Sequence, residues 1–435
     1  MVKEKNRRLK ILMNGELIGW LSSSSKGILG FVYDESWLVN DKRRTVSLSL
    51  PLSSQAYSGQ AVEDYFDNLL PDSQPIRNRL QRRVGATSTR AFDLLAHIGR
   101  DCVGALQLLP EDQDCDVRYV QAEALDDEKI QALLKGYKSA PLGVDLEADF
   151  RLSVAGAQEK TALLQYKGRW CRPSGATPTS HIFKLPIGEL GQSGIDLRES
   201  VENEWLCQQL LETFGMPTAA TEIAIFGDQK VLVVERFDRR WAADGSWLMR
   251  LPQEDMCQAT GTPGSMKYEV EGGPGMKPIM DILLGSAYSH NDRLMFMKTQ
   301  LLFWMLGAID GHAKNFSLFH LRRGIYRMTP LYDVISIYPV VKTKQIDIQR
   351  VPMAMAILGK NKHYHWDRIV RRHWLETARK CHFDGEEMEK IIGYCCDMVP
   401  GAIEKVVKVI PKGFPEYIAS SIFSRLSRAR DRLIR

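Results

Sequence analysis

Four side chains that can transfer protons or contact phosphate lie within six residues in the segment AIDGHAKNF, residues 308–316. Asp310 can accept a proton, His312 and Lys314 can face anionic oxygens, and Asn315 offers a neutral amide oxygen. Asp310 and Asn315 are separated by five positions, as are the base and the metal-binding amide in the kinase loop H-R-D-x-x-x-x-N. The spacing favours phosphoryl transfer, although D-x-x-x-x-N also arises by chance and an Asp before Gly is often a turn residue.

Magnesium-dependent phosphoryl transfer also needs a carboxylate ligand, because Mg²⁺ usually binds one or two carboxylates together with phosphate oxygens. Asp333, in the segment TPLYDVIS, follows Asp310 in the order expected for such a ligand. We therefore predict that Asn315 and Asp333 are the metal ligands. The local motif is L-Y-D rather than D-F-G, so the chain does not match an ordinary protein-kinase domain.

Three upstream segments have the types of residue that a nucleotide site requires. Lys184 lies in a predicted strand, HIFKL, as does the ATP-binding lysine of V-A-I-K, and Glu204 in the following helix is placed to pair with it. The strand end VVERFDRR, residues 233–240, could receive adenine, with Glu235 and Phe237 offering backbone groups and an apolar wall. Each feature also has a simpler interpretation. Lys184 could be a solvated strand lysine, Glu204 a surface charge, and residues 233–240 an ordinary strand end.

The segment AGAQEK, residues 155–160, is a small flexible loop between strands that could place backbone N–H groups against phosphates. It is not a Walker A loop, because Glu159 occupies the position where that motif requires glycine before lysine. A plain hairpin loop would have the same sequence character.

The elements around these residues predict an α+β protein with a strand-rich first half and a mostly helical second half. Residues 1–110 are expected to form a small β-rich module followed by helices, and residues 118–251 an α+β nucleotide-binding lobe. Residues 252–435 are expected to form a mostly helical catalytic lobe, with one hairpin across Arg323 and Gly324. This is the bilobal plan of a protein-kinase-like fold.

Hydrophobic patterns place the individual elements. Strands are expected at 9–13, 16–21, 28–32, 46–50, 161–166, 181–186, 221–226, 230–238 and within 318–333, and helices across 62–109, 200–215 and 296–306.

Composition excludes several classes of protein. The 435 residues are 44% hydrophobic and 26% charged with a net charge of +5, which indicates a globular chain rather than a disordered one. The 8 cysteines form no C-x-x-C pair, so neither a zinc site nor a disulfide framework is predicted. No apolar run reaches the roughly 18 residues of a membrane helix. We expect a soluble cytoplasmic protein with no membrane partner.

Taken in order, several long strings closely resemble the HipA family of serine/threonine kinase toxins. They are SLSLPL, FDNLLPDS, IGRDCVGAL, RLSVAGAQEKTALL, HIFKLPIGE, VERFDRRW, RLPQEDMCQ, DGHAKNFS and PLYDVIS. The resemblance implies a toxin of a bacterial toxin–antitoxin module that uses Mg²⁺ and ATP to phosphorylate a protein serine, with glutamate–tRNA ligase as the expected target. Phosphorylation of that ligase would block translation, arrest growth and favour persistence.

The resemblance also implies roles for individual residues. Asp310 would be the catalytic base, His312 and Lys314 would contact phosphates in the catalytic loop, and Asn315 and Asp333 would bind Mg²⁺. The remaining nucleotide-binding residues would be Val154, Ala155, Gly156, Ala157, Gln158, Glu159, Lys160, Lys184, Glu235, Arg236, Phe237 and Tyr332.

Ser153 matches the serine at which the family autophosphorylates. About two negative charges beside a loop that contacts a triphosphate would repel ATP and silence the kinase. The implied partners are a dimeric helix-turn-helix antitoxin of the HipB type and operator DNA. Arg379 and Lys380 fall where the family contacts DNA, although a solvated basic helix face explains these two residues equally well.

Two other functions remain open at this stage. A small-molecule kinase for an antibiotic or a sugar shares the order D-x-x-x-x-N followed by Asp, but it would lack autophosphorylation at Ser153. A non-catalytic DNA-binding corepressor could keep the fold alone. The presence of all four residues Lys184, Asp310, Asn315 and Asp333 argues against the corepressor, since a degenerate kinase normally lacks at least one of them.

Overall fold

The computed structural model describes residues 7–136, 144–145, 150–151, 158, 160–190 and 194–434. The chain divides into two compact units. We call them the strand-rich unit (Met1–Leu185, Ala224–Ser265, Ser317–Tyr326) and the helical unit (Pro186–Ile223, Met266–Phe316, Arg327–Arg435).

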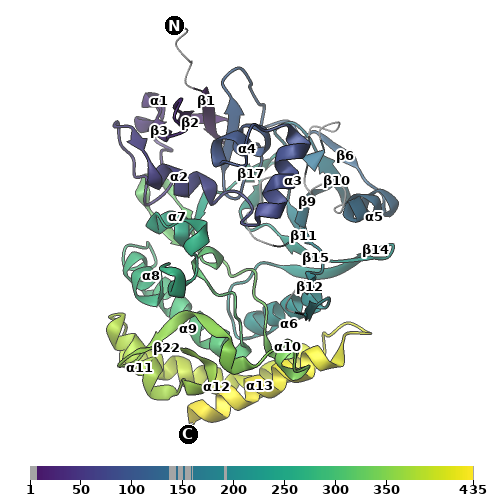
Figure 1. Cartoon of the computed structure of the whole chain (residues 1–435), viewed down its shortest axis with the longest axis vertical. Helices are drawn as coiled ribbons and strands as arrows, with labels where there is room; N and C mark the ends of the chain where they lie inside the picture. The colour runs from purple at the N-terminus through teal and green to yellow at the C-terminus, as the bar shows by residue number, and fades with distance from the viewer. Residues whose placement is uncertain are drawn as a thin grey trace. The chain divides into compact units, whose positions relative to one another are not determined.

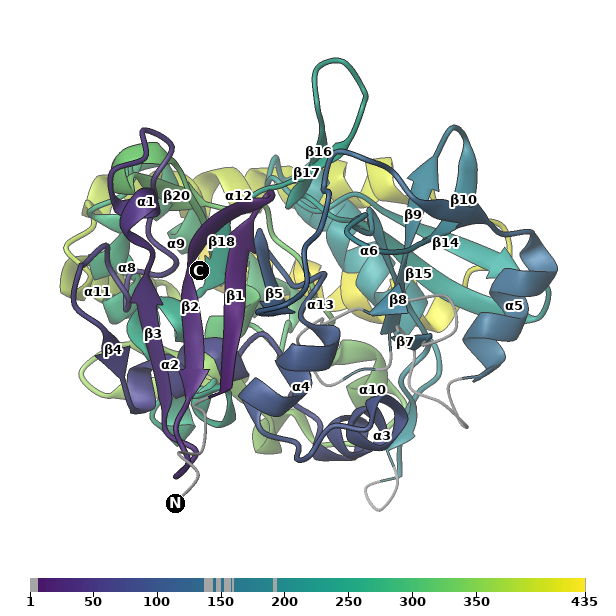
Figure 2. The same ribbon diagram turned by 90° about the horizontal axis from the view of Figure 1, so that it is seen from above.

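The strand-rich unit begins with a five-stranded antiparallel sheet in the order β4-β3-β2-β1-β5 (Figure 2). Alternate residues of β3 are buried, as expected for a strand with one face on a core. Helices α2 and α4 pack on this sheet, and Phe31, Phe66 and Leu94 are among the fully buried side chains of the core between them. The elements are β1 (Arg7–Met13), β2 (Glu16–Ser23), β3 (Leu29–Tyr33), α1 (Glu35–Leu38), β4 (Tyr57–Ser58), α2 (Gln60–Asp67), α3 (Gln74–Val84), α4 (Ala91–Ile98) and β5 (Leu106–Pro110).

A six-stranded sheet in the order β14-β15-β11-β9-β10-β6 follows. Helix α5 contributes Ile130 and Leu134 to a core shared with Leu163, Phe183 and other apolar side chains of this sheet. The elements are β6 (Ala122–Ala124), α5 (Asp127–Lys135), β9 (Lys160–Tyr166), β10 (Arg169–Pro173), β11 (His181–Lys184), β14 (Thr221–Phe226) and β15 (Gln229–Glu235).

Shorter strands form three small separate sheets, β7-β8, β16-β17 and β18-β19-β20. They are β7 (Val144–Asp145), β8 (Phe150–Arg151), β16 (Arg239–Trp241), β17 (Leu248–Arg250), β18 (Gln253–Asp255), β19 (Ser317–His320) and β20 (Tyr326–Met328), with helix α7 (Met256–Thr260) after β18.

The helical unit is organised around α9, which is buried along most of its length from Phe296 to Leu306. A helix that is apolar on most sides must be surrounded by other elements, and α8, α12 and α13 all pack against it. Helices α12 and α13 run side by side (Figure 1). The elements are β12 (Gly188–Leu190), β13 (Ile195–Leu197), α6 (Ser200–Thr213), α8 (Met276–Leu283), α9 (Ser289–Leu306), α10 (Tyr338–Lys342), β21 (Pro352–Leu358), β22 (Lys362–His365), α11 (Arg371–Lys380), α12 (Gly385–Val407) and α13 (Glu416–Ile434).

Most of the predicted elements are confirmed, but the strand predicted at 46–50 is wrong. These residues form an irregular segment whose backbone groups bond to side chains. Val46 N donates to the Tyr33 hydroxyl at 2.8 Å, and Leu50 O accepts from the same hydroxyl at 2.6 Å. A buried tyrosine therefore replaces the neighbouring strand that the alternating pattern suggested.

Two further predictions of local structure are wrong. The helical pattern expected to continue to Leu109 ends at Ile98, and β5 pairs with β1 in antiparallel register. The helical half also contains the hairpin of β21 and β22, which the sequence did not predict. Its first strand, PMAMAIL, is almost continuously buried, and a short apolar run of this kind is equally compatible with a helix.

Within the described residues, no helix combines the length and the apolar character needed to cross a membrane.

Candidate active site

The predicted catalytic loop begins where the buried helix α9 ends. Gly307 adopts a left-handed conformation with φ of 67° and donates to Phe303 O and Trp304 O, which closes the last turn. A Cβ atom at Gly307 would lie 2.7 Å from the ring of Tyr338, so only glycine fits. The polar residues that follow are thereby presented at a fixed point at the end of the helix.

Gly311 lets the loop pack directly on α9. A Cβ atom at this position would lie 2.6 Å from the ring of Phe303, a buried residue of the helix. The residues on either side of Gly311 are therefore held against a rigid element. A functional site needs this kind of support to keep its geometry.

The Asp310 carboxylate is contacted by two aromatic residues. The Tyr268 hydroxyl donates to Asp310 Oδ1 at 2.5 Å, and His312 Nε2 lies 3.3 Å from the same oxygen. The rings of Tyr268 and His312 meet edge to face with their centroids 4.9 Å apart. The Asp310 side chain remains 34% exposed, so it can still contact a substrate.

His312 is buried, with 3% of its surface exposed. Burial lowers the pKa of its imidazole, although the Asp310 carboxylate opposes that shift. The ring is therefore neutral at pH 7. Neither ring nitrogen makes a hydrogen bond to a described residue, although Nε2 lies 3.3 Å from the Asp310 carboxylate.

Asn315 is oriented by two backbone carbonyls. Its Nδ2 donates to Asp310 O at 2.6 Å and to Asp333 O at 3.4 Å. With the amide nitrogen so used, Oδ1 is the atom that can bind a cation. This orientation suits Mg²⁺, which prefers oxygen ligands, and the same contacts bring Asp310 and Asp333 to one place.

Asp333 has a strained backbone, with φ of 59°. A non-glycine residue in the left-handed region is uncommon, and strain of this kind occurs at active sites among other places. The preceding residue, Tyr332, donates its hydroxyl to Lys314 O at 2.8 Å. The two predicted site segments are therefore tied together by a side chain as well as by Asn315.

The segment after Asp333 is anchored to α6 and to the end of α9. Asn203 exchanges two hydrogen bonds with the backbone of Ser336, at 2.7 and 2.9 Å. The Ser336 hydroxyl donates to Leu306 O at 2.6 Å. The sequence analysis did not identify Asn203 or Ser336, because their roles are evident only from contacts between distant segments.

In the strand-rich unit, Lys160 on β9 and Lys184 on β11 are direct partners across the antiparallel pair. Residues opposite one another share a face of the sheet, so the two ammonium groups project to the same side. Lys184 is buried, with 6% of its surface exposed. Two neighbouring lysines suit an anionic ligand such as the phosphates of a nucleotide.

Lys184 and the predicted partner Glu204 belong to different units, and Glu204 is buried on α6. Their pairing therefore stays a prediction. Gln158, at the end of the predicted phosphate loop, donates its amide to Leu185 O. Ser153, Val154, Ala155, Gly156, Ala157 and Glu159 lie outside the described residues.

At the predicted adenine-binding segment, Glu235 ends β15 with its side chain exposed, and Phe237 meets Phe319 edge to face. Arg236 points into the protein and is 4% exposed. Its backbone N–H donates to Ser180 O and its carbonyl accepts from Arg239 N. The backbone of Arg236 is therefore hydrogen-bonded to other residues of the protein, and so is its side chain.

The Arg236 guanidinium belongs to a buried ionic cluster that the sequence analysis did not identify. The cluster contains Asp101, Arg236, Asp238, Arg239 and Arg250, and each side chain is at most 6% exposed. In the sequence, the charged strings GRDCVG and ERFDRR could have indicated this cluster, because each is flanked by apolar residues.

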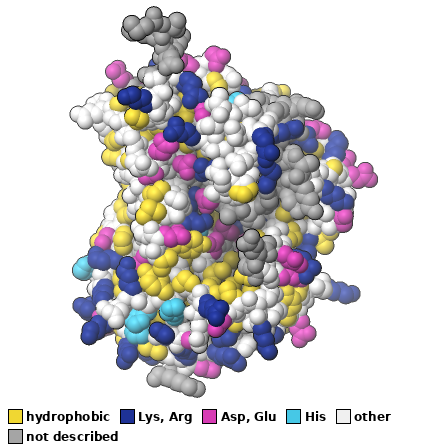
Figure 3. All heavy atoms as spheres, in the orientation of Figure 1, with side chains coloured by type: hydrophobic (Ala, Val, Ile, Leu, Met, Phe, Trp, Pro, Cys, Tyr) yellow, Lys and Arg dark blue, Asp and Glu magenta, His cyan; other side chains and the backbone are white. Residues whose placement is uncertain are grey.

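The predicted DNA-contacting residues lie at the end of α11. Arg379 has a 74% exposed side chain, whereas Lys380 donates to the Gly359 carbonyl. Lys, Arg and His side chains gather over α11 and β22, at the lower left of Figure 3. This face is basic, which is compatible with DNA contact and equally with a helix face that is simply exposed to solvent.

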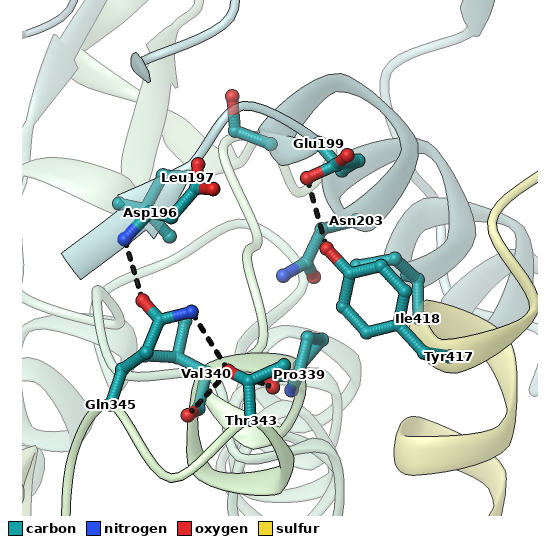
Figure 4. Close-up of a pocket in the computed structure, with 11 residues that line it drawn as sticks. Asp196, Leu197, Glu199, Asn203, Pro339, Val340, Thr343, Gln345, Tyr417 and Ile418 are labelled. Carbon is teal, nitrogen blue, oxygen red and sulfur yellow. Dashed lines mark hydrogen bonds between the residues drawn. The ribbon is translucent and has the colours of Figure 1, made fainter. Parts of the chain in front are cut away.

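A separate pocket in the helical unit lies between α6, α10 and α13 (Figure 4). Tyr417 donates its hydroxyl to Glu199 at 2.9 Å on one side of it. Gln345 accepts from Asp196 N at 2.6 Å on the other. None of the predicted site residues lines this pocket.

Comparisons with known proteins agree with this architecture. Residues 152–403 match the model of the HipA-like C-terminal domain, and residues 9–109 match that of the HipA N-terminal domain. The chain is 34% identical over 345 residues to Y4mE of Sinorhizobium fredii, which is named as a candidate kinase; the match covers 78% of this chain and 80% of Y4mE.

The chain is also 28% identical over 353 residues to the serine/threonine-protein kinase toxin HipA of Shewanella oneidensis, covering 78% of this chain and 77% of the toxin. A solved structure of Shewanella oneidensis HipA with HipB and operator DNA gives a TM-score of 0.80 at 22% identity, covering 98% of this chain and 97% of that one. The chain therefore belongs to the HipA family, and its α+β architecture is the protein-kinase-like fold of that family.

Proposed function

We propose that this chain is a Mg-ATP-dependent serine/threonine protein kinase and the toxin of a toxin–antitoxin pair. One observation carries the proposal: Asp310, the oriented Asn315 amide and the strained Asp333 are held together by hydrogen bonds in the helical unit. A base, a neutral oxygen ligand and a carboxylate are the groups that phosphoryl transfer to a hydroxyl requires.

In this mechanism, Asp310 accepts a hydrogen bond from the acceptor hydroxyl and orients it towards the γ-phosphate. Asn315 Oδ1 and the Asp333 carboxylate would hold Mg²⁺, which when bound neutralises charge on the phosphate oxygens. Lys184 and Lys160 would contact the nucleotide phosphates. Positioning and charge neutralisation supply most of the rate enhancement.

Autophosphorylation at Ser153 would limit the activity. Phosphoserine adds about two negative charges next to the loop that covers the nucleotide phosphates, and repulsion would weaken ATP binding. Prolonged incubation with ATP should inactivate the wild-type chain while Ser153→Ala keeps its activity. If both lose activity at the same rate, this part of the proposal is wrong.

The proposed target is a serine of glutamate–tRNA ligase, as the resemblance to the HipA family implies, and blocking that enzyme would stop translation and produce growth arrest and persistence. The proposed partners are a dimeric helix-turn-helix antitoxin and operator DNA, through which the complex would repress its operon. The support is that the Shewanella oneidensis relative has been solved with HipB and operator DNA. Arg379 and Lys380 are the proposed DNA contacts.

The test is incubation of the purified chain with labelled Mg-ATP, alone and with glutamate–tRNA ligase, with Asp310→Asn as the control. Phosphate located by mass spectrometry on Ser153 and on the ligase, and absent with Asp310→Asn, is the expected result. Label on Ser153 alone would support the kinase activity but exclude glutamate–tRNA ligase as its target. No label from wild type would favour a small-molecule kinase or a non-catalytic corepressor.

A further inference from the structure

Tyr268 comes from the segment of residues 261–275, upstream of α9, yet its hydroxyl donates to Asp310 Oδ1 at 2.5 Å. We propose that Tyr268 is a positioning residue, which holds the Asp310 carboxylate so that its other oxygen faces the acceptor hydroxyl. This inference rests on the proposed kinase function and adds to it a residue with no role in the catalytic-loop motif.

The contacts at Asp310 divide its two oxygens between two tasks. Tyr268 Oη and His312 Nε2 both approach Oδ1, at 2.5 and 3.3 Å. Among the described residues, no side chain occupies Oδ2 in the same way, and the carboxylate is 34% exposed. Oδ2 is therefore the oxygen that can accept the hydrogen bond of a substrate hydroxyl.

The backbone next to Tyr268 is fixed against the catalytic loop. Lys267 O accepts a hydrogen bond from Ala313 N at 3.2 Å. The Tyr268 ring packs edge to face on His312. The tyrosine is thus held by the loop that it contacts, so its hydroxyl cannot swing away from Asp310 without breaking these contacts.

The following residue anchors the other side of the segment. The Glu269 carboxylate, 6% exposed, accepts from Ala356 N at 2.6 Å and pairs with Lys362 Nζ at 2.7 Å. A Cβ atom at Gly273 would lie 2.1 Å from Met266 O, so the segment folds back on itself only with glycine there. Anchors on both sides make Tyr268 a rigid support.

A rigid support is what a general base requires. A carboxylate on a short side chain can rotate, and holding one oxygen in place fixes the direction of the other before substrate arrives. The hydrogen bond is charge-assisted, which makes it stronger than a bond between neutral groups. Its loss should lower the rate of transfer rather than the binding of nucleotide.

The experiment compares Tyr268→Phe with wild type in the full-length chain, because phenylalanine keeps the ring contact with His312 and removes only the hydroxyl. Tyr288→Phe is the matched control, since Tyr288 is 53% exposed at the start of α9. We expect kcat to fall about tenfold or more, with KM for ATP and nucleotide affinity by fluorescence within twofold of wild type. Tyr288→Phe should leave kcat, KM for ATP and nucleotide affinity unchanged.

A thermal-stability cycle of Tyr268→Phe, Asp310→Asn and the double variant tests the contact without relying on catalysis. Non-additive shifts in Tm are expected, and additive shifts would overturn the proposal. If wild type transfers no phosphate, the proposed function fails and this cycle alone decides whether Tyr268 holds Asp310.

The kinetic outcomes also separate positioning from its alternatives. An unchanged kcat for Tyr268→Phe would leave the tyrosine a purely structural role. A higher kcat, or a lower KM for the protein acceptor, would mean that Tyr268 blocks the substrate position. Phosphate found on Tyr268 itself would make it an acceptor. Each of these results would overturn the positioning role.

Discussion

At the residue scale, the contacts of Asn315 explain why an amide rather than a carboxylate occupies its position. Both of its described side-chain hydrogen bonds are donated by Nδ2 to backbone carbonyls, those of Asp310 and Asp333. A carboxylate has no hydrogen to donate and would bring negative charge against two carbonyl oxygens. The amide therefore joins the two site segments while presenting Oδ1 for a cation.

We predict that Asn315→Asp lowers the free energy of unfolding by about 1–3 kcal/mol, because the two part-buried carbonyls lose their donor. Urea unfolding of the full chain measures this change. Asn291→Asp is the matched control: Asn291 is exposed in the first turn of α9, and its substitution should change stability by less than about 0.5 kcal/mol. Equal stability of Asn315→Asp and wild type would contradict this account of the site.

At the scale of elements, α9 acts as the platform of the catalytic loop. Its apolar residues bury it, and its last turn places Phe303 under Gly311. Because a packed helix resists displacement, any group added at Gly311 must move the loop rather than the helix.

We predict that Gly311→Ala lowers the rate of phosphate transfer about 10- to 100-fold, because small displacements of catalytic groups are costly. Adding Phe303→Leu should restore part of the rate by making room for the new methyl group. Gly393→Ala in α12 is the control: its Cβ would meet no atom within 4 Å, so it should stabilise the helix by about 0.5–1 kcal/mol. Full activity of Gly311→Ala would show that the loop is not held by this contact.

The sequence predicted α9 and the residues after it because both signals are local. The apolar run required burial, and the spacing of Asp310 and Asn315 is fixed along one loop. Tyr268 could not be predicted in the same way, since it approaches Asp310 from a segment 42 residues away. Residues 46–50 were predicted wrongly for the same reason, because a distant tyrosine hydroxyl satisfies their backbone groups.

At the scale of the whole chain, one ionic cluster joins the two matched family domains. Asp101 lies in the region that matches the HipA N-terminal domain, whereas Arg236, Arg239 and Arg250 lie in the HipA-like C-terminal domain. Arg239 Nη2 donates to Asp101 Oδ1 at 2.8 Å, and Arg236 and Arg250 lie within 3.4 Å of the same carboxylate. The cluster belongs to a single compact unit, the strand-rich unit.

The charges of this cluster couple the N-terminal region to the stability of the strand-rich unit. Burial raises the pKa of Asp101, but the three guanidinium groups outweigh it and hold that pKa well below its usual range. Removing the carboxylate would leave three buried arginines with Asp238 as the one remaining carboxylate among the described members of the cluster. A buried ion pair that loses one partner typically destabilises a protein by about 3–5 kcal/mol.

We therefore predict that Asp101→Asn lowers the free energy of unfolding by about 3–5 kcal/mol at pH 7, measured by urea unfolding. Because the folded-state pKa of Asp101 is depressed, its ionised form stabilises the protein above about pH 4, and that contribution falls as the pH drops. At pH 3 the difference between wild type and Asp101→Asn should be smaller by about 1 kcal/mol. Asp112→Asn, at an exposed position, should match wild type at both pH values. A difference that is independent of pH would mean that the cluster stabilises the unit by packing rather than by charge.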